Sequence, residues 1–87
     1  MRILLVEDDP VLNNQVKGSL EENGYSVDSA LDGEEGHFLG DTEPYDAVIL
    51  DLGLPKLDGI TVLENWRKEN KKFPVLILTA RDRWSEK

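Results

Sequence analysis

Three short runs of branched apolar residues are spaced along the chain, at residues 3–6, 47–50 and 75–78. Each run is apolar at every position, which is typical of strands that helices cover on both faces, and therefore of a parallel sheet. A further segment, residues 25–30, alternates in character from one residue to the next. This alternation is the pattern of a strand near the edge of a sheet, where covering is less complete.

The segments between these strands carry the signals of helices. Asp9, followed by a proline, predicts the start of a first helix that stops at Gly24. A second helix is expected over about residues 33–40. Because glycine inside a helix is less favourable than alanine, Gly36 and Gly40 should keep this helix short and easily deformed.

A third helix is expected over about residues 59–69, with Ile60, Leu63 and Trp66 one turn apart on an apolar inner face. Strands and helices then alternate along the whole chain, which predicts an open, doubly wound α/β parallel sheet with four strands and three helices. In such a sheet, ligands bind outside the carboxyl ends of the strands.

Composition and charge narrow the classes of function. The chain has 87 residues, so it forms one small domain at most. It has no cysteine for a disulfide scaffold or a zinc site, which fits a reducing cytoplasm. Its first apolar run is too short for a signal peptide or a membrane span. A net charge of −8 disfavours direct contact with DNA or anionic lipid.

Acidic residues follow two of the predicted strands. Glu7, Asp8 and Asp9 come after the first strand, and Asp51 comes after the third. Because these strands are neighbours in a doubly wound sheet, Asp8 and Asp51 should meet in one crevice. Two close carboxylates repel each other unless a cation joins them. Mg²⁺, which binds through one or two carboxylates and several waters, fits this pattern.

Each acid also has a purely structural interpretation. Acids after a first strand often cap the following helix, and we favour this role for Asp9. Glu7 and Asp8, each taken alone, fit either interpretation. Asp51 differs because it ends an apolar strand, where a carboxylate is partly desolvated, and no basic residue stands beside it. We therefore expect Asp51 to be functional.

Two further segments complete a predicted site for an anion and a cation. Gly53 would let the backbone approach a bound ion, and its carbonyl oxygen is a candidate ligand. Thr79 follows the fourth strand and offers a hydroxyl. The backbone amide of Ala80 offers a donor where an anion attached to Asp51 would lie.

The segments ILLVEDD, VILDLGLPKLDG and VLILTARD resemble, in order and spacing, the three motifs of response-regulator receiver domains of two-component systems. Within that family they are most similar to the winged-helix OmpR/PhoB subfamily. The resemblance implies a flavodoxin-like fold and a sensor histidine kinase that phosphorylates Asp51. It also implies Mg²⁺ ligands at Asp8, Asp51 and the Gly53 carbonyl, with Glu7 bound through water. Thr79 matches the switch hydroxyl that moves toward the phosphoryl group.

Receivers of this family continue into a fifth strand, which ends in a lysine that holds the phosphoryl group, and into a fifth helix. Lys87 follows Thr79 too closely to be that lysine. The resemblance therefore implies that residues 1–87 are a C-terminally truncated receiver domain, and that DNA is bound only by an output domain outside them. We expect residues 75–78 to form an exposed apolar edge through which the chain self-associates.

Two other functions compete with this hypothesis. Phosphohydrolases similar to haloacid dehalogenase also form an aspartyl phosphate, but they place a second Asp where this chain has Gly53. A receiver-like interaction module that is never phosphorylated is the other alternative, and metal binding distinguishes it. We expect a phosphoacceptor rather than an enzyme. His37 and the basic segment 67–72 are expected to be solvated surface residues.

Overall fold

The computed structural model describes residues 1–54 and 56–78, in which strands and helices alternate as the sequence predicts. The elements in chain order are β1 (Arg2–Val6), α1 (Pro10–Glu22), β2 (Ser26–Ala30), α2 (Gly33–Thr42), β3 (Ala47–Asp51), α3 (Gly59–Lys68) and β4 (Val75–Leu78). The second strand begins at Ser26, one residue later than predicted. None of the helices in these described residues is long and apolar enough to cross a membrane.

The four strands form one parallel sheet in the order β2-β1-β3-β4. The predicted doubly wound, flavodoxin-like α/β fold is therefore confirmed. Strands β1 and β3 are neighbours in the middle of the sheet, and their register pairs Val6 with Leu50. The chain leaves these two strands in opposite directions across the sheet, toward β2 and toward β4, so the switch point lies between their carboxyl ends.

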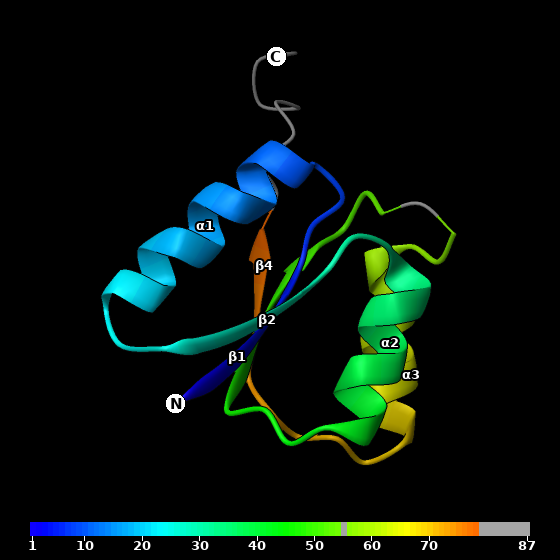
Figure 1. Cartoon of the computed structure of the whole chain (residues 1–87). Coiled ribbons are helices and arrows are strands. Elements are labelled where there is room, and N and C mark those ends of the chain that lie inside the picture. Colours follow the sequence, from blue (N-terminus) through cyan, green and yellow to red (C-terminus); the bar gives the residue numbers. More distant parts are fainter. Residues whose placement is uncertain (55, 79–87) are drawn as a thin grey trace, which may run out of the picture.

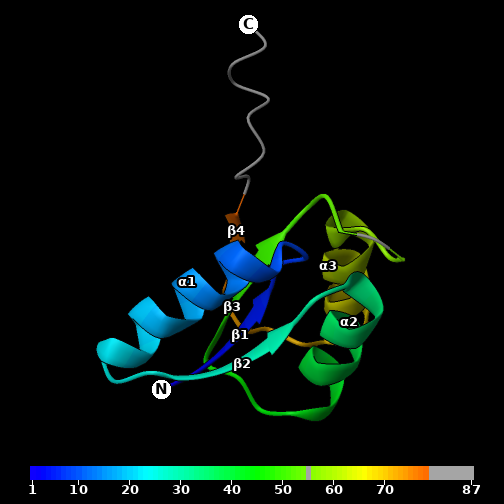
Figure 2. The same cartoon turned by 45° about the horizontal axis from the view of Figure 1, so that its top comes forward.

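Helices cover the two faces of the sheet unequally. Helix α1 lies on one face, and α2 and α3 lie together on the other (Figure 1 and Figure 2). Since successive strand residues point to opposite faces, Leu4 and Val6 pack with Trp66 of α3, whereas Ile3 and Leu5 lie on the α1 side. The larger core is therefore the one beneath α2 and α3.

Helix α2 is longer and more tightly packed than the sequence predicts. It continues to Thr42 rather than to residue 40, and Gly36 and Gly40 are both buried. A Cβ atom on Gly36 would lie 2.8 Å from Cγ1 of Val6, and one on Gly40 would overlap the indole ring of Trp66. The predicted short helix is thus present and ends two residues later, and its glycines allow α2 to approach both the sheet and α3.

Helix α3 buries the predicted face in part, since Trp66 is buried and Leu63 packs against the core. Ile60 is 48% exposed, whereas Val62 and Trp66 are fully buried. The Trp66 ring packs edge-on against Phe73, with centroids 5.1 Å apart. Trp66 is thus a core residue. The prediction that Ile60 belongs to the inner face is wrong, since Val62 occupies that place.

His37 is not the solvated surface residue that we expected. Its side chain is 27% exposed and lies between α2 and the end of α3, where Nε2 is 3.5 Å from a carboxylate oxygen of Glu69. Its backbone carbonyl accepts a hydrogen bond of 3.3 Å from the indole nitrogen of Trp66. His37 therefore belongs to the contact between α2 and α3. Arg67 and Lys68, in the last turn of α3, are exposed as predicted.

Candidate functional site

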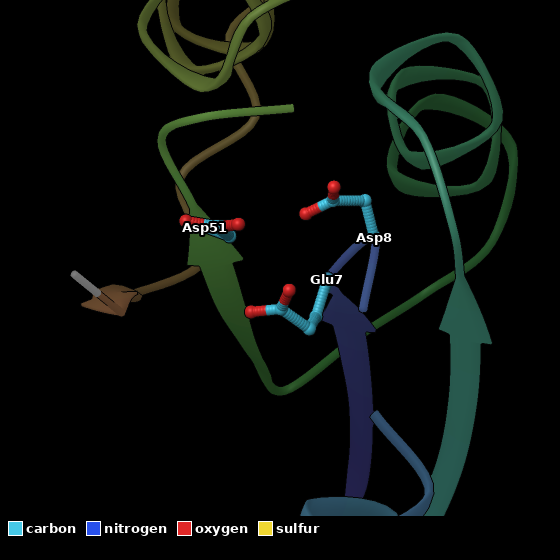
Figure 3. Close-up of side chains that lie close together, drawn as sticks. All are labelled: Glu7, Asp8 and Asp51. Carbon is cyan, nitrogen blue, oxygen red and sulfur yellow. The ribbon is translucent and has the colours of Figure 1, made fainter. Parts of the chain in front are cut away.

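Three carboxylates meet at the carboxyl ends of the two central strands. Because Val6 pairs with Leu50, the residues that follow them, Glu7 and Asp51, leave adjacent positions of neighbouring strands. One oxygen each of Glu7, Asp8 and Asp51 lies within 4.8 Å of the others. Figure 3 shows these side chains gathered between the ends of β1 and β3. We refer to Glu7, Asp8 and Asp51 as the acidic cluster.

The acidic cluster is largely removed from solvent. Glu7 is fully buried, Asp51 is 1% exposed, and Asp8 is partly buried. Burial raises the pKa of the Glu7 carboxyl above its ordinary value, and the negative charges of Asp51 and Asp8 raise it further. Like charges held this close in a dry site repel each other, so the arrangement favours a bound cation.

The hydrogen bonds of Glu7 leave one of its oxygens available to a ligand. Oε2 accepts a hydrogen bond of 2.9 Å from the backbone amide of Asp9. Oε1 is buried and has no hydrogen-bond donor among the described residues. A water molecule bound to a cation would satisfy this oxygen. The atoms that the cluster offers to a metal ion are all carboxylate oxygens, which suit a hard divalent ion such as Mg²⁺.

Asp9 has the structural role that we expected. It is the N-cap of α1, and its Oδ1 accepts hydrogen bonds from the backbone amides of Val11 at 3.0 Å and Leu12 at 3.3 Å. Asp9 is exposed, in contrast to Glu7. The prediction that separated Asp9 from the other acids of its segment is therefore confirmed.

Asn13 supports the site, a role that the sequence analysis did not predict. This buried residue of α1 donates from Nδ2 to the backbone carbonyls of Glu7 at 3.0 Å and Ala30 at 3.3 Å. It thereby ties the end of β1, just below the acidic cluster, to the end of β2. A signal was present: Asn13 stands three residues before Val16, on the inner face of the helix, where an apolar residue would be usual.

The loop after β3 returns toward Asp51. The backbone amide of Gly53 donates a hydrogen bond of 3.3 Å to Oδ1 of Asp51, so this glycine lies beside the carboxylate as the sequence suggests. The predicted role of its carbonyl as a metal ligand stays a prediction. Thr79 and Ala80, the other two predicted site residues, lie outside the described residues.

Comparison with known proteins agrees with this geometry. The sequence model of the response regulator receiver domain matches residues 3–87. The chain belongs to the response regulator receiver family. The family inferred from the three sequence motifs is thus confirmed.

Curated relatives of this receiver are transcriptional regulators. The transcriptional regulatory protein QseB of Haemophilus influenzae is 51% identical over 87 residues, which are 100% of this chain and 39% of QseB. The virulence transcriptional regulatory protein PhoP of Salmonella typhimurium is 40% identical over the same 87 residues, again 39% of its length. Both belong to the OmpR/PhoB subfamily that the motifs indicate. The chain therefore spans less than half the length of these relatives.

Solved receiver structures have the same fold. The response regulator TrrA of Thermotoga maritima, in a complex with Mg²⁺ and BeF, superposes with a TM-score of 0.87 at 36% identity, covering 98% of this chain and 74% of that one. TrrA in complex with the histidine kinase ThkA gives a TM-score of 0.84 at 37% identity, covering 95% and 72% of the two chains.

Proposed function

We propose that Asp51 accepts a phosphoryl group from a sensor histidine kinase, at a site that also binds Mg²⁺. The observation that carries this proposal is the acidic cluster, which lies within 4.8 Å at the switch point of a receiver fold. The Mg²⁺ complex of TrrA supports the choice of cation. The complex of TrrA with ThkA supports a histidine kinase as the partner.

The position and burial of Asp51 support a role as the nucleophile. A carboxylate oxygen of Asp51 attacks the phosphorus of a kinase phosphohistidine, an O–P bond forms, and the N–P bond breaks with its electron pair left on the imidazole. Burial of Asp51 at the end of a central strand holds the carboxylate in place and limits competing water. Mg²⁺, bound by Asp8, Asp51 and the Gly53 carbonyl and through water by Glu7, would offset the negative charge of the cluster and of the phosphoryl oxygens.

Thr79 and Ala80 complete the proposal. The Thr79 hydroxyl and the Ala80 backbone amide would donate hydrogen bonds to the phosphoryl oxygens on Asp51. In this family such a hydroxyl moves toward the phosphoryl group, and this movement links modification to the output surface. For the longer protein we propose a cytoplasmic transcription regulator whose DNA-binding domain lies outside residues 1–87, as the relatives QseB and PhoP suggest.

The site favours a phosphoacceptor over a phosphohydrolase. An enzyme that hydrolyses phosphate esters through an aspartyl phosphate needs an acid to protonate the leaving alcohol. The position two residues after Asp51 is Gly53, which offers only backbone groups, and its amide already donates to Asp51. We therefore expect one phosphoryl group per chain and no sustained turnover of phosphate esters.

Intact mass measurement tests the proposal. The protein, an Asp51→Asn variant and an Asp58→Asn control are each incubated with a small-molecule phosphodonor and Mg²⁺. Asp58 lies in the same loop and caps α3 through the amide of Thr61, a role that Asn also performs. We expect one phosphoryl increment on the parent and on Asp58→Asn, and none on Asp51→Asn. An increment on Asp51→Asn would overturn the assignment, and no increment on the parent would favour the unphosphorylated interaction module.

We further propose that the chain self-associates through β4. This strand is the edge of the described sheet, and Leu76 and Ile77 are 66% and 37% exposed. An apolar hollow of about 430 Å³ adjoins it, lined by residues that include Leu20, Ile49 and Leu76. A second copy related by a two-fold axis would cover both surfaces. Light scattering should show a dimer that Leu76→Lys disrupts, whereas a stable monomer of the parent at high concentration would rule the dimer out.

A further inference from the structure

The loop that follows Asp51 lies against the start of α2. A Cβ atom on Gly33, the first residue of α2, would overlap the carbonyl oxygen of Leu57 and would lie 2.6 Å from its carbonyl carbon. Figure 1 shows the loop after β3 passing beside this end of the helix. The loop and the helix therefore touch backbone to backbone, and the contact exists only because residue 33 has no side chain.

A second contact joins the same two segments. The Lys56 ammonium lies 3.8 Å from a carboxylate oxygen of Asp32, which also caps α2 through the amide of Glu35. Lys56 has a φ of 70°, in the left-handed region that favours glycine. The loop thus holds a conformation that is unfavourable for a lysine, and contacts with α2 hold it there.

The near end of the loop is tied to Asp51 itself. The amide of Gly59, the first residue of α3, donates a hydrogen bond of 3.0 Å to the carbonyl of Leu52. A Cβ atom on Gly59 would overlap the carbonyl oxygen of Asp51 and lie 2.7 Å from Cα of Leu52. Helix α3 therefore holds the beginning of the loop, and α2 holds its end.

We propose that Gly33 is a positioning residue of the acceptor site. It acts through the backbone of Leu57, by allowing the loop to close against α2 and so to hold Gly53 beside Asp51. This inference rests on the proposed function, because it assigns to Gly33 the placement of groups that bind the cation. A side chain at residue 33 would push the loop outward and separate Gly53 from the acidic cluster.

The test compares Gly33→Ala with Gly40→Ala in the same helix. A Cβ atom on Gly40 would overlap the Trp66 ring, far along α2 from the loop, so this control also disturbs packing but leaves the loop contact intact. Gly18→Ala in α1 is a second control, because a Cβ atom there meets nothing within 4 Å. For each variant, the Mg²⁺ concentration at half-maximal phosphorylation is measured by intact mass, and the unfolding midpoint is measured separately.

We expect Gly33→Ala to raise the half-maximal Mg²⁺ concentration about tenfold or more, as groups that orient metal ligands commonly do. Gly40→Ala should lower the unfolding midpoint with little change in the Mg²⁺ requirement. Gly18→Ala should leave the Mg²⁺ requirement unchanged and raise the unfolding midpoint slightly, because alanine is more favourable than glycine inside a helix. Equal shifts in the Mg²⁺ requirement for Gly33→Ala and Gly40→Ala would overturn the proposal, since a general loss of stability would then explain both.

Leu57→Ala covers the case in which Gly33→Ala does not fold. It keeps the Leu57 backbone but removes the side chain that packs this end of the loop against the core, so it loosens the loop without placing a side chain into α2. We expect a similar rise in the Mg²⁺ requirement. An unchanged requirement in this variant would overturn the proposal.

Calorimetric titration with Mg²⁺ alone separates this inference from the proposed function. A parent that binds Mg²⁺ but takes up no phosphoryl group would contradict the function of Asp51, and the Gly33 variants would still be judged by their Mg²⁺ affinity. A parent that is phosphorylated while Gly33→Ala behaves identically would contradict only the role of Gly33.

Discussion

The two ends of the sheet differ in how their charged side chains are arranged: like charges gather at one end, and opposite charges pair at the other. At the carboxyl end, the acidic cluster brings three carboxylates within 4.8 Å of one another. At the amino end, the Arg2 guanidinium lies 2.8 Å from Asp28 and 3.3 Å from Glu43, and its carbon lies 5.0 Å from the centre of the Tyr45 ring. The Tyr45 hydroxyl donates a further hydrogen bond of 2.8 Å to Asp28. We call these four residues the Arg2 network.

The acidic cluster needs a bound cation to offset its charges, whereas the acids of the Arg2 network already have partners within the protein. Hydrogen bonds from Tyr45 and Arg2 lower the pKa of Asp28, so the fold favours its charged form. Burial raises the pKa of Glu7, so the fold disfavours its charged form. The Arg2 network therefore stabilises the empty protein by itself. The acidic cluster stabilises the protein only when a cation offsets its repulsion.

The largest expected effect is the loss of a single acid from the cluster. Asp8→Asn should raise the Mg²⁺ concentration at half-maximal phosphorylation about a hundredfold, because it removes a charged ligand. Asp9→Asn is the matched control, with the same change of charge one residue away and a side chain that still caps α1. Phosphorylation followed by intact mass over a series of Mg²⁺ concentrations measures both. Equal shifts would mean that net charge, rather than ligation by Asp8, sets the requirement.

Mg²⁺ itself should stabilise the protein through the carboxyl end alone. At ten times its dissociation constant, a ligand that binds only the folded state adds about 1.4 kcal/mol to the free energy of unfolding. Urea denaturation with and without Mg²⁺ measures this increment. We expect Tyr45→Phe to retain it and Asp8→Asn to lose most of it. An increment that disappears in Tyr45→Phe would show that the two ends are coupled.

A smaller effect is expected from a change in the Arg2 network, at the amino end of the sheet. Tyr45→Phe removes the hydrogen bond to the Asp28 carboxylate and leaves the ring in place, which should lower the free energy of unfolding by about 1 kcal/mol. Urea denaturation without Mg²⁺ gives the value. The Mg²⁺ requirement for phosphorylation should not change. A protein whose stability is unaffected would show that the Arg2 network contributes little.

The smallest expected effect is a change in how the stability of the protein depends on pH. Because the pKa of Asp28 is lowered in the folded state, its contribution to stability is present above the ordinary carboxyl value and is lost as pH falls through the folded value. Urea midpoints between about pH 3 and pH 6 should therefore fall less steeply for Asp28→Asn than for the parent. Glu22→Gln, at an exposed position, serves as control. Parallel curves for Asp28→Asn and the parent would contradict the prediction.

Much of the site could be predicted from local signals. The apolar runs before Glu7 and Asp51 identify strands, and the alternation of strands and helices makes β1 and β3 neighbours. Two acids at the ends of neighbouring parallel strands must then lie close together. Asn13 could not be predicted as readily, because its partners are the carbonyls of residues 7 and 30 on two different strands.

The sequence by itself determined the order of the elements, the Asp9 cap of α1 and the acids at the strand ends, because these depend on neighbours within a few positions along the chain. Only the tertiary structure decided that Val62 rather than Ile60 is buried in α3, and why α2 contains glycines. Gly33 and Gly40 meet Leu57 and Trp66, which are more than twenty residues away in the chain. A glycine that looks unfavourable in its own helix is required where another segment comes within contact of its backbone, and such contacts exist only once the chain has folded.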